Sequence, residues 1–289
     1  MIKLPLPADG NGNLLLARTV FETCISRVRN PDLKARLSAV TESIEAAGNL
    51  YDEKCRAGNL HQLLPQDAIN GNVSNEEMVG VYTRRMAQTG QPGRPFYDLI
   101  RAAAPGAICP LCAIGVVTTL DHQLPKAKFS QYVVTPNNLV PACDWCQGEK
   151  DSGYPSGAQD QWIHPYFDDL QADVWLGARV VEAPNPGFVF EVVAPNTWDS
   201  TRIRKAEKHL STFGLYRLYS VNAGADIYSQ QGYLQDLFAA GGANAVRDFM
   251  AEAAARIRYP MNSWRKATYE AASASEWFCD MGFNEIGGN

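Results

Sequence analysis

The chain has 289 residues, of which 46% are hydrophobic, and 26 Lys and Arg are outweighed by 31 Asp and Glu to give a net charge of -5. This length and apolar content predict a folded protein with a sizeable core, and they exclude a disordered chain. No run approaches the roughly 18 apolar residues of a membrane span, and the first residues lack the apolar segment of a signal peptide. We therefore expect a cytoplasmic protein without membrane contacts.

Four of the seven cysteines form two CxxC pairs, Cys109 with Cys112 and Cys143 with Cys146. Two such pairs supply the four thiolates of a tetrahedral zinc site, and a closed four-cysteine site is structural and not catalytic. The interval between the pairs is much longer than the roughly 15–20 residues of a common zinc ribbon. The sequence therefore predicts structural zinc, with additional structure built between the two pairs.

Between the two CxxC pairs, short apolar segments are separated by polar residues. Residues 116–120 are rich in β-branched side chains and predict a strand that delivers Asp121 and His122 at its end. A second short strand is expected over 139–141, followed by a helix that begins near Asp144. The predicted order is strand, loop, strand, helix, with a cysteine pair at each open end.

Residue types in this stretch suit phosphodiester hydrolysis, which needs a base, a nucleophile and positive charge on the developing oxyanion. His122 is the imidazole of the stretch, and an ordinary histidine pKa of about 6.5 suits a base. Asp121 would point to the opposite face of an ideal strand, so both side chains serve one site only if the strand ends or bends there. Lys150 would either contact a phosphate or remain a solvated helix lysine.

The stretch resembles the ββα-metal core of HNH endonucleases. The residues that carry the resemblance are Cys109, Cys112, Asp121, His122, Pro125, Asn138, Leu139, Cys143, Cys146 and Lys150.

This resemblance implies that His122 is the general base, that Asp121 binds a catalytic Mg²⁺ or Mn²⁺ ion, and that Asn138 braces the loop behind the histidine. Gln147 stands where the family has Asn or His. It keeps a carbonyl oxygen for a hard cation but adds one methylene, so catalytic metal binding would be weaker or shifted.

The segments flanking this core are expected to be helical, which gives an α+β fold with regions 1–104, 105–170 and 171–289. In the first region, residues 14–28 carry a helical apolar stripe, Asn30 and Pro31 open a helix to about Cys55, and Ser74 with Glu77 forms a capping box. The basic residues leading into the core would contact DNA or would be exposed charges; they are Arg84, Arg85, Arg94, Arg101, Lys126 and Lys128.

After the core, the resemblance extends to the HPYFD segment that contains His164. His164 would add a ligand or contact a phosphate, or it would be hydrogen-bonded while the aromatic residues pack against the core. Residues 174–193 predict a β-hairpin that turns at 184–187. Helices are expected to follow over 225–239 and 243–259, with Pro260 ending the second and a last helix starting near Trp264.

The resemblance implies an endonuclease acting on double-stranded DNA, similar to the HNH subunits that accompany ATPases in bacterial anti-phage systems such as Septu. The chain contains no GxxxxGK[ST] phosphate loop, so any ATPase would be a partner subunit. A partner would also compensate for the negative net charge, which disfavours DNA affinity. Two alternatives remain open: a catalytically silent zinc-containing adaptor for nucleic acid or protein, and an assembly subunit of an ATPase complex.

Overall fold

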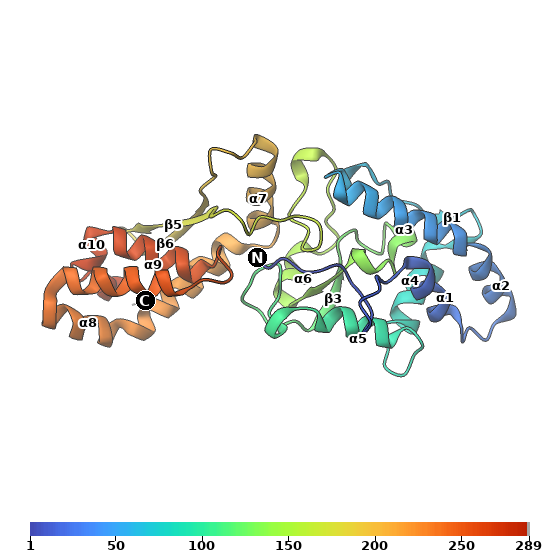
Figure 1. The fold of residues 1–289 in the computed structure, drawn as a ribbon, viewed down its shortest axis with the longest axis horizontal. Coiled ribbons are helices and arrows are strands. Elements are labelled where there is room, and N and C mark those ends of the chain that lie inside the picture. Colours follow the sequence, from blue (N-terminus) through green and yellow to red (C-terminus); the bar gives the residue numbers. More distant parts are fainter. Residues whose placement is uncertain (288–289) are drawn as a thin grey trace. The chain divides into compact units, whose positions relative to one another are not determined.

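The computed structural model describes residues 1–287, and the chain forms two compact units (Figure 1). One unit comprises residues 2–168, and the other comprises Met1 with residues 169–289. Sequence regions 1–104 and 105–170 therefore share one unit over residues 2–168. Helices predominate, and the strands form three two-stranded antiparallel sheets within the described chain, so the fold is mixed α and β.

In the unit of residues 2–168, helices precede and follow a small β-hairpin along the chain, and a second, shorter hairpin lies between two of the helices. Its helices are α1 (Ala17–Ile25), α2 (Pro31–Ala39), α3 (Thr41–Arg56), α4 (Asn75–Arg85), α5 (Arg94–Ala102) and α6 (Asp144–Lys150). Its strands are β1 (Ala68–Ile69), β2 (Val73–Ser74), β3 (Thr119–His122) and β4 (Leu139–Ala142). Short 3₁₀ turns lie at 60–62, 105–107, 130–132, 136–138 and 158–160.

Local signals set several of these helix boundaries. Ser74 accepts a hydrogen bond from the backbone of Glu77, whose side chain returns to the backbone of Ser74, which confirms the predicted capping box. The single helix predicted from Asn30 to Cys55 is instead two helices. The chain leaves helical geometry at Val40, which has φ -101° and ψ 5° and which is buried in the core between α2 and α3.

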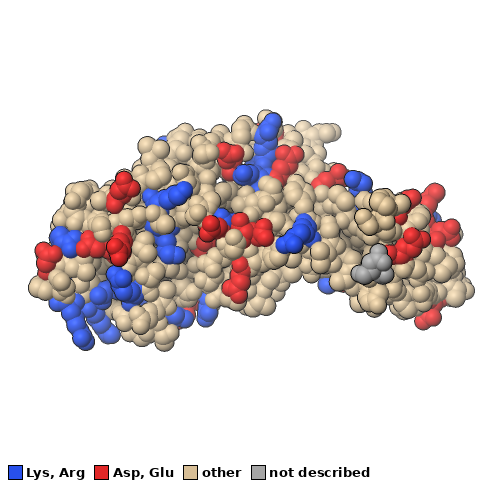
Figure 2. All heavy atoms as spheres, turned by 180° about the vertical axis from the view of Figure 1, so that it is seen from behind, with Lys and Arg blue, Asp and Glu red and all other residues tan. Residues whose placement is uncertain are grey.

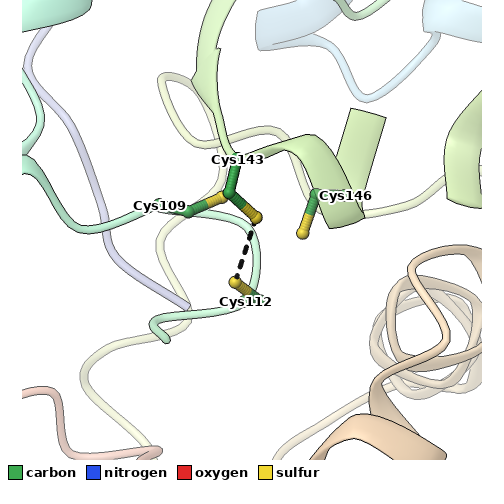
Figure 3. A group of neighbouring side chains, drawn as sticks. All are labelled: Cys109, Cys112, Cys143 and Cys146. Atoms are coloured by element: carbon green, nitrogen blue, oxygen red, sulfur yellow. Dashed lines mark hydrogen bonds between the residues drawn. The ribbon is translucent and has the colours of Figure 1, made fainter. Parts of the chain in front are cut away.

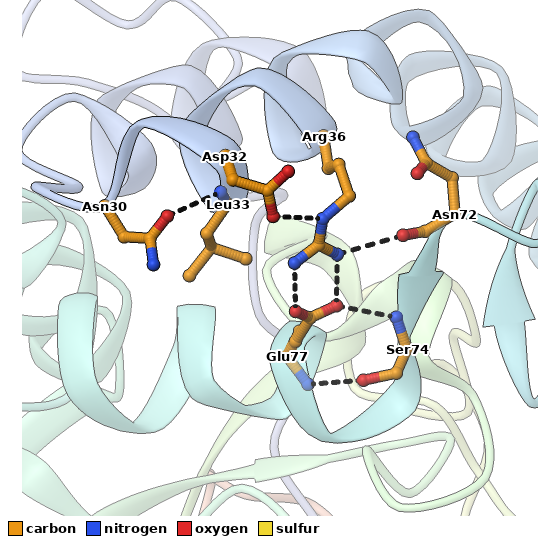
Figure 4. Close-up of polar contacts among 7 residues, drawn as sticks. All are labelled: Asn30, Asp32, Leu33, Arg36, Asn72, Ser74 and Glu77. Atoms are coloured by element: carbon orange, nitrogen blue, oxygen red, sulfur yellow. Dashed lines mark hydrogen bonds and ion pairs between the residues drawn. The ribbon is translucent and has the colours of Figure 1, made fainter.

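An ion-pair network ties α2 to the start of α4 (Figure 4). The guanidinium of Arg36 donates to both carboxylate oxygens of Glu77, at 2.8 and 2.6 Å, and to Asp32 at 2.9 Å. A further bond reaches the carbonyl of Asn72 at 3.0 Å. Since Glu77 also caps α4, a single arginine fixes both the capping residue and the neighbouring helix.

The hairpin of β3 and β4 is built into the main core of this unit. Leu120 and Leu139 pack with buried residues of α1, α4 and α5, and the strands pair antiparallel with Asp121 opposite Val140 and His122 opposite Leu139. The first strand lies later than predicted, because Val116 only bridges to Ile108 and the ladder begins at Thr119. Asp121 and His122 therefore lie within the strand and not beyond it.

The unit of residues 169–289 packs a β-hairpin against helices. Strands β5 (Leu176–Val181) and β6 (Gly187–Val192) confirm the predicted hairpin. The helices are α7 (Ser200–Thr212), α8 (Leu215–Arg256), α9 (Trp264–Ala274) and α10 (Glu276–Cys279), with a 3₁₀ turn at 282–285.

Helix α8 is interrupted at Gly242, which has φ 66° and ψ -160°. The rings of Tyr233 and Phe249 lie 5.1 Å apart, so the chain folds back on itself there. This break lies between the two helices predicted over 225–239 and 243–259. None of the described helices combines the length and apolar composition needed to cross a membrane.

Candidate metal centre and neighbouring polar site

The four cysteines of the two CxxC pairs converge on one point (Figure 3). All four are buried, and their sulfurs lie within 4.8 Å of one another. The Sγ atoms of Cys112 and Cys143 are 3.8 Å apart, which is the separation expected for sulfurs about 2.3 Å from a shared zinc ion in a tetrahedron. The residues present fit a zinc ion.

Backbone geometry brings the first pair into position. Ala113 adopts a positive φ of 56°, and the N–H of Gly115 donates to the sulfur of Cys112 at 3.3 Å. A Cβ on Gly115 would lie 2.6 Å from the Cys143 sulfur, so only glycine allows this approach. The second pair begins α6, directly after β4. The pairing of β3 with β4 therefore brings the two CxxC pairs together, although about 30 residues separate them in the sequence.

Asp121 and Lys150 form a buried ion pair close to the cysteine cluster. Lys150 Nζ lies 3.0 Å from Asp121 Oδ2, and the lysine side chain is 1% exposed. Burial raises the pKa of Asp121, and the Lys150 charge opposes that rise. The structure thus brings together two sequence-predicted site residues, but it places the lysine on the aspartate and not in solvent.

His122, the next residue of β3, is enclosed by α4 and by the loop that follows the strand. Its Nε2 lies 2.9 Å from the carbonyl oxygen of Val133, and because a carbonyl only accepts, Nε2 carries the hydrogen. Nδ1 keeps its lone pair and makes no hydrogen bond with a described residue. The ring of Tyr82 packs edge-on at 4.4 Å. Burial lowers the pKa of His122 to about 3, so the imidazole is neutral.

Asn138 holds the loop that follows His122. Its Oδ1 accepts from the N–H of Leu124 at 2.7 Å, and its Nδ2 donates to the carbonyls of Leu124 and Tyr132 at 3.2 and 3.1 Å. The side chain is fully buried. The resemblance to HNH endonucleases implied a bracing role for this residue.

Gln147 lies half-buried on α6, one turn before Lys150. Its side chain forms no hydrogen bond with any residue in the described chain. The structure therefore shows no hydrogen bond between Gln147 and Asp121 within the described chain.

His164 is held by aromatic residues of the N-terminal unit. Its Nδ1 accepts from the N–H of Tyr166 at 3.3 Å, so the neutral ring donates from Nε2 to the hydroxyl of Tyr51, 3.0 Å away. The ring of Phe167 contacts it edge-on at 4.9 Å. These contacts attach the segment after the core to α3, as in the packing alternative considered for this residue.

Two neighbours of the site were not anticipated from the sequence. Tyr82 lies on α4, donates from its hydroxyl to the carbonyl of Leu120 at 3.2 Å, and covers His122. Lys126 lies over the Tyr82 ring at 5.7 Å and lowers the pKa of Asp121 by its charge. The sequence predicted Lys126 to be either a DNA contact or an exposed charge. No pattern in the sequence marks Tyr82, because its role arises from the packing of α4 against β3.

Comparison with known proteins gives one relative. Protein ea31 of Escherichia phage lambda is 30% identical to this chain over 168 residues, which cover 57% of this chain and 56% of the relative. The chain thus matches little more than half the length of that protein. No family model and no solved structure matches the chain.

Proposed function

We propose that this chain is a metal-dependent HNH-type endonuclease that hydrolyses DNA phosphodiester bonds. The observation that carries the proposal is the order of β3, β4 and α6 on a four-cysteine cluster, with Asp121, His122 and Lys150 gathered on these elements. The same order was the basis of the resemblance noted in the sequence.

In this proposal His122 is the general base. The Val133 carbonyl fixes the hydrogen on Nε2, which leaves Nδ1 to take a proton from the attacking water. The oxygen of that water forms the new bond to phosphorus, and the bond to the leaving alkoxide breaks. Asn138 keeps the loop of Leu124 in place behind the base. Asp121, with Gln147, would hold a Mg²⁺ or Mn²⁺ ion, which supplies positive charge to the transition state.

Lys150 has a defined part in this scheme. In the structure its ammonium neutralises Asp121, so it competes with a cation for the same carboxylate. A bound cation would release Lys150 toward the substrate phosphate, which is one of the two roles that the sequence suggested for it.

One observation favours the alternative of a catalytically silent zinc-containing adaptor. The Asp121 carboxylate is already paired. His122 is only 3% exposed, and burial lowers its pKa to about 3, far below the value near 6.5 that suits a base. If Asp121 and His122 stay enclosed, the protein would bind zinc in the four-cysteine site but would not hydrolyse DNA.

Partners belong to the proposal as well. Double-stranded DNA is the proposed substrate, an ATPase subunit the proposed regulator, and bacterial anti-phage defence the proposed setting. An ATPase partner would supply the DNA affinity that a net charge of -5 does not.

The test is nicking of supercoiled plasmid by the wild type in Mg²⁺, Mn²⁺ or EDTA, compared with His122→Ala and His122→Asn. Both variants are checked for bound zinc, and His61→Ala serves as a histidine control outside the site. We expect metal-dependent nicking by the wild type and the control, and a loss of at least about 100-fold in the His122 variants. Equal nicking by a zinc-retaining His122 variant would refute the assigned base. Absence of nicking in every metal would favour the adaptor.

A further inference from the structure

A second group of basic side chains surrounds an open hollow between the α1–α2 turn and the end of α4. The hollow has a volume of about 390 Å³ and is lined by Arg27, Arg29, Asn30, Arg85 and Gln91, among others. Its lining contains three arginines and no acidic residue. Figure 2 shows lysine and arginine side chains gathered at the lower left of that face, over the end of the unit where Figure 1 places α1, α2 and α4.

The three arginines are electrostatically uncompensated. Other arginines of this unit pair with carboxylates, as Arg36 does with Glu77 and Arg94 with Asp98. Neither Arg27, Arg29 nor Arg85 forms an ion pair with a residue of the described chain. Like charges around one hollow repel one another, and a bound anion removes that cost. In a chain with five more acidic than basic residues, this grouping points to an anionic ligand.

The hollow is partly ordered before any ligand binds. The guanidinium of Arg85 donates to the carbonyl of Arg27 at 3.4 Å, which links the end of α4 to the α1–α2 turn. The side-chain oxygen of Asn30 caps α2 through the N–H of Leu33, so its amide nitrogen is directed away from that bond. A fixed guanidinium loses less conformational entropy on binding an anion than a mobile one.

We propose that this hollow binds a backbone phosphate of a nucleic-acid strand. Guanidinium groups match the geometry of phosphate oxygens and bind them through paired hydrogen bonds. The lining offers no aromatic ring on which a base would stack, so it recognises the phosphate and not the base. The contact is therefore independent of sequence and positions the strand.

The location connects this contact to the candidate site. Arg85 follows Tyr82 by three residues on α4, a rise of about 4.5 Å, and the Tyr82 ring packs against His122. The inference rests on the proposed function in taking the bound polymer to be the substrate strand. Helix α4 then carries both Tyr82, which covers the proposed general base His122, and Arg85, which holds the phosphate backbone of the strand.

The test measures binding and not cleavage. Fluorescence anisotropy of a labelled DNA duplex in EDTA compares the wild-type protein with the triple variant Arg27→Gln, Arg29→Gln and Arg85→Gln over a range of salt concentrations. We expect the dissociation constant to rise about tenfold or more, and the slope of log affinity against log salt to fall by about 2 to 3. Circular dichroism and zinc content confirm that the variant is folded.

A charge-matched control is the triple variant Arg179→Gln, Arg204→Gln and Arg258→Gln, which removes three exposed arginines of the other unit. This variant should bind as the wild type does. The inference is overturned if the two triple variants lose the same affinity for DNA. It is also overturned if the variant of the three hollow arginines binds DNA as the wild type does, or if the wild type binds no DNA. A wild type that binds through these arginines but cuts with no metal retains the inference and defeats the proposed nuclease.

Discussion

At the scale of single residues, the buried pair of Asp121 and Lys150 dominates the energetics of the site. Both side chains have left water, and each is compensated chiefly by the other. Removing one partner of such a pair leaves an uncompensated buried charge, which costs about 3–5 kcal/mol.

We therefore expect Lys150→Met to destabilise the unit of residues 2–168 by about 3 kcal/mol or more. The double variant Asp121→Asn with Lys150→Met should recover most of that loss, because no charge remains buried alone. Urea unfolding of the zinc-loaded proteins measures both effects. Strictly additive losses in the double variant would show that the two charges do not stabilise each other.

Part of the site could be predicted from the sequence, because residue type and spacing determine its chemistry. Two CxxC pairs specify four thiolates, and the cluster that they form is present. The partners of His122 are different. The Val133 carbonyl and the Tyr82 ring are neither rare nor regularly spaced, and only the tertiary packing of α4 and the loop against β3 brings them to the histidine. Patterning along the chain does not encode such contacts.

At the scale of elements, the tie between α2 and α4 is sensitive to acid. Hydrogen bonds from Arg36 lower the pKa of Glu77 from 4.5 to about 2. A carboxyl with a lowered folded-state pKa contributes stability above its unfolded pKa, and that contribution is lost as pH falls from 4.5 toward 2. The pair is partly exposed and screened, so the contribution is about 1 kcal/mol or less.

Glu77→Gln should therefore lower the free energy of unfolding by about 1 kcal/mol at pH 7, with the deficit shrinking toward pH 2.5. Glu76→Gln is the matched control from the same helical turn, since Glu76 forms no ion pair with a described residue. Denaturant unfolding over this pH range gives both values. A deficit that stayed constant with pH would assign the effect to the lost cap and not to the charge.

Elements with strong local signals were predicted well, and those defined by a subtle break were not. The capping box of α4 and the hairpin of β5 and β6 follow from residues within a few positions of each other. The separation of α2 from α3 depends on the backbone of Val40, a residue that helices tolerate. The end of α7 likewise depends on one residue, Gly214, whose left-handed conformation separates α7 from α8.

At the scale of the whole molecule, two compact units predict separable stability. Gly242 holds the reversal of α8 with φ 66° and ψ -160°, a conformation essentially restricted to glycine. Gly232 lies within the same helix in ordinary geometry, and a Cβ there would meet nothing within 4 Å.

Gly242→Ala should destabilise the unit of residues 169–289 by about 1–3 kcal/mol. Gly232→Ala should stabilise the same unit by up to about 1 kcal/mol, because alanine is the better helix former. Calorimetry reports the unfolding of both units, and the transition that depends on zinc should not move in either variant. A shift of that transition would show that the two units unfold as one.

The short helix α6 carries both Cys146, one of the four cysteines that fit a zinc ion, and Lys150, the partner of Asp121. Cys146 and Lys150 lie four residues apart, one helical turn, so the metal site and the ion pair both require the same turn to be formed. Two contacts that stabilise one conformation strengthen each other by an equal factor in both directions. A structural ion thus exerts a thermodynamic influence on the carboxylate, and zinc affinity becomes a remote measure of whether Lys150 is seated on Asp121.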